Sequence, residues 1–469
     1  MSPTVPAVSV PTSTPSAEGV PPESLDAFLD ALEEDPQIEP HALVVHRHGH
    51  RILEAYWAPH RPGQIRNVYS LSKTFTGTAL GLLVEEGRLE LDDLAAHHFP
   101  ELLAGADERT RRIRIRHLAS MSSGHDRELL IEARAKDPDD LVAGFFRISP
   151  DHEPGSYFAY SQPPVLALAT LLQRLAGDRI VDYLRPRVFD PLGLGEVRWD
   201  QYRAGVDLGF GGMYTTVDAA ARLGQLYLDD GVWEGQRLLP EGWVAEASKV
   251  QVANPMRVEP DWRQGYGLLI WRCQHGYRGD GAFGQYMIVL PEQDMVIAFF
   301  SATDPMQPVL DHIWEILLPS LRDAALPDGP GDEALATRVE GLSLETAGPR
   351  LGGDPPGSVR GRFTRGAGRS HPTVTAVEVS AHELVLEEGD SSLRLPLTEE
   401  WSHCQDGPFA TSATVDGEGQ LIVDLVFTAT PHRIELKMDP SSGTFRAHWC
   451  HMPLFFGADR RLAALRPPA

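Results

Sequence analysis

A cluster of prolines and glycines between Pro327 and Gly331 divides this 469-residue chain into two parts with different hydrophobic patterns. The part before it mixes stretches of helical periodicity with several β-type runs, whereas only short β-type runs with regular turns follow it. The pattern predicts an α+β domain over residues 23–325, a linker over 326–354, and a separate all-β domain, either a barrel or a sandwich, over 355–469.

The first 22 residues contain six prolines among Ser, Thr and Val, with almost no charge. Such a segment buries too little apolar surface to offset the entropy lost on ordering, so we expect residues 1–22 to form a disordered tail. No lysine or arginine precedes Arg47, so a charged leader is not seen. No run of about 18 apolar residues occurs either. We expect a cytoplasmic protein that does not enter a membrane.

The charge balance restricts the classes of partner. The chain carries 42 Lys+Arg against 66 Asp+Glu, a formal net charge of −24. This excess repels nucleic-acid phosphates and anionic lipid surfaces, so a small molecule is the expected partner. Three cysteines lie far apart in the sequence and form neither a disulfide framework nor a metal-binding CxxC pair. The oligomeric state stays open.

Apolar spacing predicts both helices and strands before the boundary. The expected helices are a segment starting near Ser24 and residues 74–86, 165–175, 180–184, 216–228 and 309–321. The expected strands are residues 42–45 and 51–57, joined by a turn at 48–50, and residues 267–272, 285–290 and 295–300. Residues 91–199 have mainly helical periodicity.

The pattern Ser70-Leu71-Ser72-Lys73 is the strongest indication of chemistry. Residues three apart on a helix share one face, so Ser70 and Lys73 can approach each other. A buried ammonium group loses hydration and its pKa falls, which lets the neutral amine accept a serine proton. Of the four lysines in the chain, Lys73 alone has a serine three residues before it. The alternative is an N-cap serine followed by an exposed lysine.

The surroundings of this pattern favour the catalytic alternative. Residues 69–76, followed by 80–83 and 86–93, resemble the opening of the active-site serine β-lactamase-related family, which includes class C β-lactamases, penicillin-binding carboxypeptidases, esterases and transacylases. The resemblance implies an antiparallel sheet with flanking helices plus an all-helical lobe. It also implies that Ser70 is the nucleophile, that Lys73 activates it, and that no cofactor or metal is needed.

The same resemblance suggests a second catalytic element. Residues 154–162 look like the turn in which family members carry a Tyr-x-Asn pattern, so Tyr160 takes the place of the proton-relay tyrosine, with Tyr157 as a competing choice. Gln162 stands where the pattern has Asn. Because Gln is one methylene longer, its contact with Lys73 or with a substrate carbonyl is open.

A third element is expected on a strand at the edge of the site. Residues 277–286 resemble the glycine-rich stretch of family esterases and amidohydrolases, in which Gly281 lets substrate approach the strand. The N–H of Ala282 would then pair with that of Ser70 as an oxyanion hole. Gly279 stands where a Lys or His usually meets a β-lactam carboxylate. Arg278 either replaces that cation or pairs with Asp280.

Several alternatives remain beside this assignment. Tyr266 either lines the substrate pocket or is an ordinary rim or core residue, and the second alternative is favoured. The alternating histidines of residues 46–50 could bind a metal, although a hairpin tip is the better interpretation. No GxSxG is present, which argues against an α/β-hydrolase elbow. Three functions stay open: an esterase or amidase for small acyl substrates, a transacylase with an amine or alcohol acceptor, and a non-catalytic binding module.

The role of the all-β domain is also open. Its aromatic residues either dock the domain on the catalytic part or fill its own core; they are Phe409, Trp449, Phe455 and Phe456.

Overall fold

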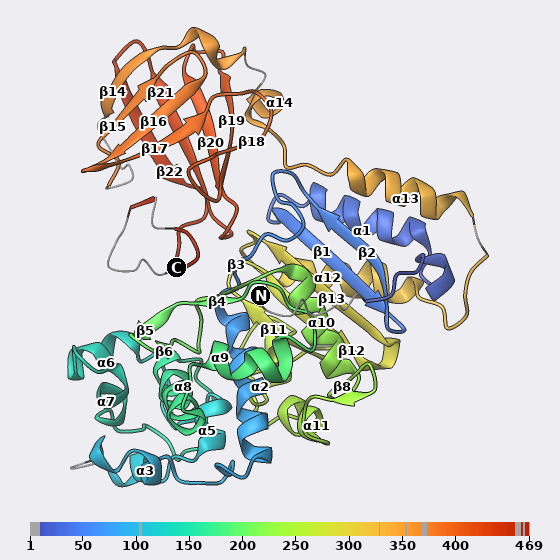
Figure 1. The fold of residues 1–469 in the computed structure, drawn as a ribbon, viewed down its shortest axis with the longest axis vertical. Helices are drawn as coiled ribbons and strands as arrows, with labels where there is room; N and C mark the ends of the chain where they lie inside the picture. Colours follow the sequence, from blue (N-terminus) through green and yellow to red (C-terminus); the bar gives the residue numbers. More distant parts are fainter. Residues whose placement is uncertain are drawn as a thin grey trace, which may run out of the picture.

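A six-stranded antiparallel sheet organises the first part of the chain (Figure 1). Its strand order is β10-β11-β12-β13-β1-β2, so the first two strands of the chain extend the sheet formed by four later ones. The strands are β1 (Pro40–Arg47), β2 (His50–Tyr56), β10 (Trp271–Arg272), β11 (Tyr277–Gly281), β12 (Gln285–Leu290) and β13 (Met295–Ser301). The computed structural model describes residues 10–102, 106–327, 329–351, 354–366, 373–454, 461–462 and 465–468.

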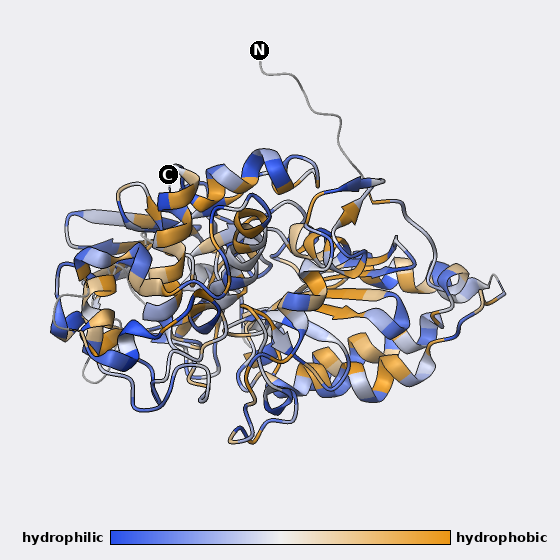
Figure 2. Cartoon of the chain, turned by 90° about the horizontal axis from the view of Figure 1, so that it is seen from below, coloured by the Kyte–Doolittle hydropathy of each residue, from blue (hydrophilic) through white to orange (hydrophobic). Residues whose placement is uncertain are grey.

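Both faces of this sheet are buried. On β1, Leu43 and Val45 join one apolar cluster, whereas Ala42 and Val44 join another on the opposite face. Successive strand residues point to opposite faces, so a strand covered on both sides must be apolar throughout. This explains why the central strands appear in the sequence as continuous apolar runs, and Figure 2 shows hydrophobic residues along them.

One face is covered by helices from the two ends of the domain. They are α1 (Pro22–Glu34), α12 (Gln307–His312) with a π turn (Ile313–Leu317), a 3₁₀ turn (Leu318–Ser320), and α13 (Pro330–Glu340).

The prediction of a disordered tail is wrong for residues 10–22, which include a 3₁₀ turn (Ser16–Glu18) and the fully buried Val20. The segment predicted as a linker is largely helical: α13 packs on α1, and α14 (Ala347–Leu351) packs on the second domain.

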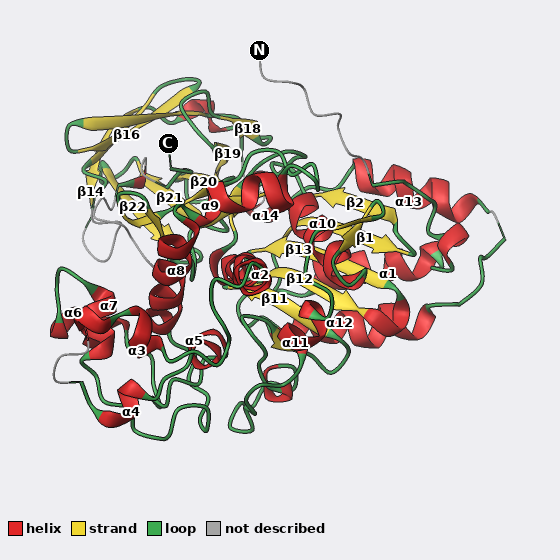
Figure 3. Ribbon diagram, turned by 60° about the horizontal axis from the view of Figure 1, so that its bottom comes forward, coloured by secondary structure: helices red, strands yellow, loops and turns green. Residues whose placement is uncertain are grey.

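The other face supports α2 (Ser72–Glu85) and α10 (Val217–Leu228). Beyond α2 lies the helical lobe (Figure 3). Its helices are α3 (Ala95–His98), α4 (Glu108–Arg111), α5 (Ile115–Ala119), α6 (Leu130–Lys136), α7 (Leu141–Phe146), α8 (Gln162–Ala176) and α9 (Ile180–Leu184), with 3₁₀ turn Pro100–Leu102 and π turn Arg185–Phe189. Small pieces complete the domain: β3 (Arg66–Asn67), β4 (Arg198–Trp199), β5 (Gln201–Arg203), β6 (Val206–Asp207), β7 (Met213–Thr215), β8 (Val232–Trp233), β9 (Gln236–Arg237), α11 (Trp243–Ser248), and 3₁₀ turns Tyr69–Leu71, Trp262–Gln264 and Pro291–Gln293.

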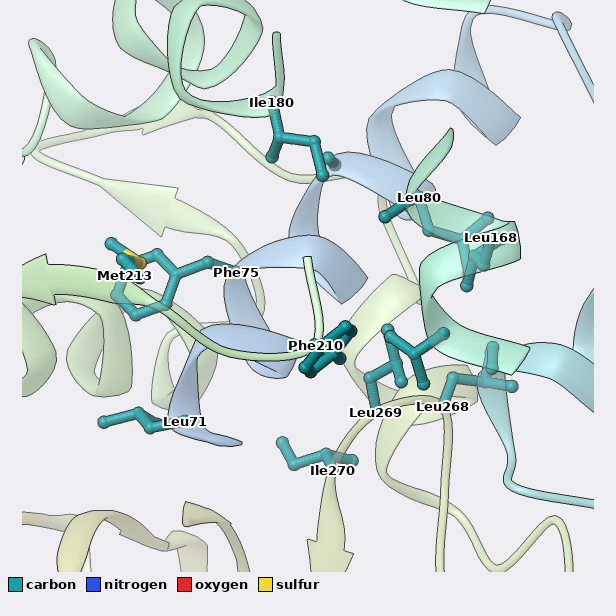
Figure 4. Close-up of a cluster of buried hydrophobic side chains, with 14 of the residues drawn as sticks. Leu71, Phe75, Leu80, Leu168, Ile180, Phe210, Met213, Leu268, Leu269 and Ile270 are labelled. Atoms are coloured by element: carbon teal, nitrogen blue, oxygen red, sulfur yellow. The ribbon is translucent and has the colours of Figure 1, made fainter. Parts of the chain in front are cut away.

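Helix α2 is enclosed by the sheet and the lobe. Its Phe75 and Leu80 are fully buried, with Leu168 of α8 and Phe210 among the surrounding side chains in Figure 4. Gly81 permits this close packing, because a Cβ there would lie 2.4 Å from the Trp243 ring. A helix apolar on nearly all sides belongs in the interior of a protein, and this places its first turn between the two halves of the domain.

The second domain is a nearly closed nine-stranded barrel. The strand order is β17-β16-β15-β14-β22-β21-β20-β19-β18, with β14 and β22 paired in parallel. The strands are β14 (Gly361–Arg365), β15 (Ala376–Val379), β16 (Glu383–Glu388), β17 (Ser391–Pro396), β18 (Ser402–His403), β19 (Phe409–Val415), β20 (Leu421–Phe427), β21 (Arg433–Asp439) and β22 (Thr444–Trp449), preceded by a 3₁₀ turn (Pro356–Ser358). This decides between the predicted barrel and sandwich in favour of the barrel.

Two of the four aromatic residues suspected of docking belong to the barrel's own core. Phe409 is fully buried in the barrel core and Trp449 packs against that core, whereas Phe455 and Phe456 lie outside the described residues. The barrel nevertheless contacts the first domain. Asn67 of β3 donates its N–H to the carbonyl of Ala429, and Arg433 forms an ion pair of 3.1 Å with Glu39.

Two further predictions are modified by the structure. Of the strand expected over 267–272 only β10 forms, and β11 instead begins in the glycine-rich stretch. The turn between β1 and β2 lies at His48 and Gly49 as expected, but His46 is fully buried rather than exposed at the tip. No described helix has the length and apolar character needed to cross a bilayer.

The glycines of β11 allow the strand to lie against the start of α2. A Cβ on Gly279 would be 2.4 Å from Thr74 Oγ1, and one on Gly281 would be 2.0 Å from the Val68 carbonyl oxygen. The second contact is with backbone, which cannot rotate away. The strand and the turn before α2 can therefore approach this closely only with glycine at position 281.

We expect Gly281→Ala to lower the stability of the first domain by about 1–3 kcal/mol through overpacking. Thermal unfolding followed by circular dichroism measures this as a fall in the transition midpoint. Gly195→Ala is the matched control, because its new methyl group would meet no atom within 4 Å. An unchanged midpoint in Gly281→Ala would contradict the packing argument.

Candidate active site

Ser70 and Lys73 meet at the start of α2. Ser70 lies in the 3₁₀ turn Tyr69–Leu71, and Lys73 lies in the first turn of the helix that follows. The Lys73 Nζ is 2.9 Å from the Ser70 Oγ. Lys73 is 1% exposed, whereas Ser70 is partly exposed and can be reached from solvent. The geometry excludes the alternative in which Lys73 is a solvated surface residue.

Lys73 also contacts two oxygens from outside its own helix. Its Nζ donates to Gln162 Oε1 at 2.8 Å and to the Phe210 carbonyl oxygen at 2.6 Å. Both oxygens can only accept hydrogen bonds. A neutral Lys73 amine would donate its two hydrogens to them and direct its lone pair at the Ser70 hydroxyl.

The charge state of Lys73 is set mainly by its burial. Loss of hydration lowers the pKa of the ammonium to about 7, and the nearby carboxylates of Glu128 and Asp280 partly oppose this fall. A substantial fraction of the neutral amine is therefore present at neutral pH. This is the protonation state in which Lys73 can accept a proton.

Tyr160 and Gln162 come from the segment that leads into α8. The Tyr160 side chain lies close enough to Ser70 for the serine to lower its pKa slightly, and the Lys73 Nζ lies 4.8 Å from the centre of the Tyr160 ring. Burial raises the pKa of the Tyr160 phenol, and the charge of Asp280 raises it further, so the hydroxyl stays protonated at neutral pH. The longer Gln162 side chain does reach Lys73, which answers the question that its extra methylene raised.

Tyr266 is placed behind this group rather than at its surface. It is 1% exposed and meets the Trp271 ring edge-on at 4.7 Å and the Tyr160 ring at 6.3 Å. Trp271 stacks on Tyr160 at 5.6 Å. Of the two alternatives for Tyr266, its burial favours the core position, from which it supports the Tyr160 ring.

β11 brings Gly281 and Ala282 to the turn that contains Ser70. The close approach of Gly281 to Val68 and to the backbone N of Leu71 places the end of the strand beside that turn. Ala282 is partly exposed there. Arg278 is fully buried, with its Nε 3.0 Å from Asp280 and its guanidinium 4.2 Å from the centre of the Trp262 ring. It pairs with Asp280 and does not replace the missing cation at position 279.

Two carboxylates near Lys73 were not identified as site residues from the sequence. Asp280 lies on β11 between the two glycines, and its charge acts on both Lys73 and Tyr160. Glu128 accepts the backbone N–H of Gln162 at 3.0 Å and so anchors the start of α8. The Phe210 carbonyl was also missed, since a backbone acceptor leaves no trace in the amino-acid sequence.

Among the described residues, no three His, Cys, Asp or Glu side chains form a group that could hold a metal ion.

Comparisons with known proteins agree with this architecture. The chain is 26% identical to penicillin-binding protein 4 of Amycolatopsis lactamdurans over 61% of this chain and 84% of that protein. It is also 26% identical to the 6-aminohexanoate-dimer hydrolase of Paenarthrobacter ureafaciens, over 64% of this chain and 82% of that protein. A family VIII carboxylesterase structure has a TM-score of 0.52 at 15% identity and covers 66% of this chain and 99% of that one.

The family itself follows from a match to a family model. The family model described as Beta-lactamase matches residues 25–319, which include most of α1, the whole six-stranded sheet and the helical lobe. Since the matched segment exceeds half of the chain and contains Ser70, Lys73 and Tyr160 in the arrangement described above, the chain belongs to the Beta-lactamase family of serine hydrolases.

Proposed function

We propose that this protein is a serine hydrolase that cleaves an ester or amide of a small acyl substrate through an acyl-Ser70 intermediate. The observation that supports this most strongly is the contact of 2.9 Å between Ser70 Oγ and a buried Lys73 whose pKa is lowered to about 7. One curated relative is by name a hydrolase of a small substrate, the 6-aminohexanoate-dimer hydrolase. The fold is shared with esterases as well, so both ester and amide bonds are included.

Acylation begins with proton transfer from Ser70 to Lys73. The neutral Lys73 amine accepts the hydroxyl proton as Ser70 Oγ attacks the carbonyl carbon of the substrate. The negative charge that develops on the carbonyl oxygen is held by the backbone N–H groups of Ser70 and Ala282. Lys73, rather than Tyr160, is the base in this scheme, because the raised pKa of Tyr160 keeps its phenol protonated.

Tyr160 then acts as the relay to the leaving group. Its side chain lies next to both Ser70 and Lys73, so in this scheme it gives its proton to the leaving oxygen or nitrogen and is reprotonated from Lys73. A water molecule releases the acyl group from Ser70 by the reverse sequence of proton transfers. An amine or alcohol in place of water would make the same site a transacylase.

We expect Ser70→Ala to reduce ester turnover by several orders of magnitude while leaving the fold intact, because it removes the nucleophile. Intact-mass analysis after reaction with a fluorophosphonate gives a second measurement, in which wild-type protein gains one adduct and the variant none. Ser156→Ala, an exposed serine of the turn before Tyr160, is the control. Wild-type labelling of Ser70→Ala would refute the assignment of the nucleophile.

We expect kcat/KM to rise with pH through about 7, because Lys73 must lose its proton before it can accept that of Ser70. Glu128→Gln removes a negative charge that raises the pKa of Lys73, so its profile should move to lower pH. The Gln oxygen can still accept the N–H of residue 162. Rates are measured at the isosbestic wavelength of nitrophenol. A profile that stays in place in Glu128→Gln would exclude Lys73 as the titrating group.

We expect weak turnover of penicillins and cephalosporins. Position 279 lacks the cation that would meet a substrate carboxylate, and Asp280 and Glu128 add negative charge nearby. Losing one charge-assisted hydrogen bond costs about 1.5–3 kcal/mol, or about 10- to 150-fold. The test compares nitrocefin with a neutral nitrophenyl ester and with a nitrophenyl ester that ends in a carboxylate. Equal efficiency on all three would show that substrate charge does not matter.

A further inference from the structure

The C-terminal barrel reaches the catalytic domain next to the nucleophile. The turn between β20 and β21 receives the N–H of Asn67 on the Ala429 carbonyl at 2.9 Å. Two residues after Asn67, in the 3₁₀ turn that follows β3, the Tyr69 hydroxyl lies 2.5 Å from Nε2 of His432. The two hydrogen bonds are made by the residues on either side of Val68, and the second of these residues directly precedes Ser70. A barrel residue 363 positions away in sequence thus contacts the residue that precedes the nucleophile.

The direction of the Tyr69–His432 hydrogen bond can be assigned. Nδ1 of His432 lies 3.0 Å from the carbonyl oxygen of His451, which can only accept, so Nδ1 carries the ring hydrogen. Nε2 is therefore the acceptor and Tyr69 the donor. Burial lowers the pKa of His432 to about 3, with the Arg66 charge acting in the same direction. The histidine stays neutral, and the bond persists, throughout the neutral pH range.

His432 also contacts the residue that follows the other oxyanion-hole donor. The ring of Phe283, next to Ala282, lies 5.1 Å from the His432 ring and 5.4 Å from the Tyr69 ring, edge-on to both. Tyr69 has a φ of 49° and Phe283 a φ of 65°. This left-handed region is unfavourable for bulky residues and is kept only where the surroundings hold it. Both N–H donors of the proposed oxyanion hole thus adjoin a residue in a strained conformation.

We propose that His432 is a positioning residue that holds Tyr69 and Phe283 in these conformations, and thereby aligns the backbone N–H groups of Ser70 and Ala282 for catalysis. The reactivity of Ser70 then depends on the docked barrel. This inference rests on the proposed acyl-Ser70 function, since it assigns His432 an effect on that reaction.

Variants of the hydrogen-bonded pair test this role. His432→Leu removes the acceptor of the Tyr69 hydroxyl, so we expect kcat for a small nitrophenyl ester to fall about 5- to 30-fold with KM little changed. Tyr69→Phe should reduce kcat similarly or less, because it removes the hydroxyl itself. His432→Gln restores an acceptor and should recover part of the rate. His448→Leu, an exposed histidine of the same barrel, is the control.

The double variant separates positioning from independent effects. If the two side chains act through one hydrogen bond, His432→Leu/Tyr69→Phe should be no slower than the slower single variant. Losses that multiply, or a wild-type kcat in His432→Leu, would overturn the proposal. Should His432→Leu fail to fold, Tyr69→Phe still decides the question, because it removes the same hydrogen bond. A wild-type kcat in Tyr69→Phe would overturn the proposal.

A measurement without turnover distinguishes this inference from the proposed function. The ¹⁵N chemical shifts of His432 should show a hydrogen on Nδ1 and a hydrogen-bonded acceptor at Nε2 that does not titrate down to about pH 4, and the Nε2 signal should move in Tyr69→Phe. If fluorophosphonate fails to label wild-type Ser70 while this signature is present, the proposed function is wrong. If Ser70 is labelled and the signature is absent, the positioning role of His432 is wrong.

Discussion

The burial of the Lys73 ammonium between Ser70, Gln162 and Phe210 is the interaction on which the arrangement of the domain depends. Removing a charged amine from water is expensive, and the expense is offset only if hydrogen-bond acceptors surround it. Here the acceptors come from the start of α2, the start of α8 and the loop before β7. The sheet side and the helical lobe are thereby joined at the group that is most costly to bury. The same loss of hydration lowers the pKa of Lys73 into the range where the amine can act as a base.

Strand β11 lies closer to the start of α2 than any residue larger than glycine would permit. Glycine at positions 279 and 281 lets β11 lie against the turn before α2. Such an approach places backbone N–H groups, which cannot be displaced by rotation of a side chain, beside Ser70. This packing leaves no room for a cation at position 279. The feature that shapes the site therefore also removes a contact that would select anionic substrates.

The barrel is connected to this arrangement by polar and aromatic contacts rather than by a continuous apolar core. The clusters of buried residues in the catalytic domain and in the barrel are separate. Between them lie the Glu39–Arg433 ion pair and the hydrogen bonds of Asn67 and Tyr69. Interfaces of this polar kind join domains that each have their own core. The barrel thus keeps its own core while His432 lies beside the turn that contains Ser70.

The sequence by itself determined the division into an α+β domain and a β domain, most of the helices, and the pairing of Ser70 with Lys73. These are local properties, since helix periodicity and a spacing of three residues depend only on neighbours along the chain. Resemblance to a known family added Tyr160, Gln162 and the glycine-rich strand. Tertiary structure alone decided that residues 10–22 are packed, that Tyr266 lies behind Tyr160, that Arg278 pairs with Asp280, and that His432 meets Tyr69. Each of these depends on contacts between residues distant in sequence or on burial, and neither the burial of a side chain nor its partner across the fold is encoded in a local pattern.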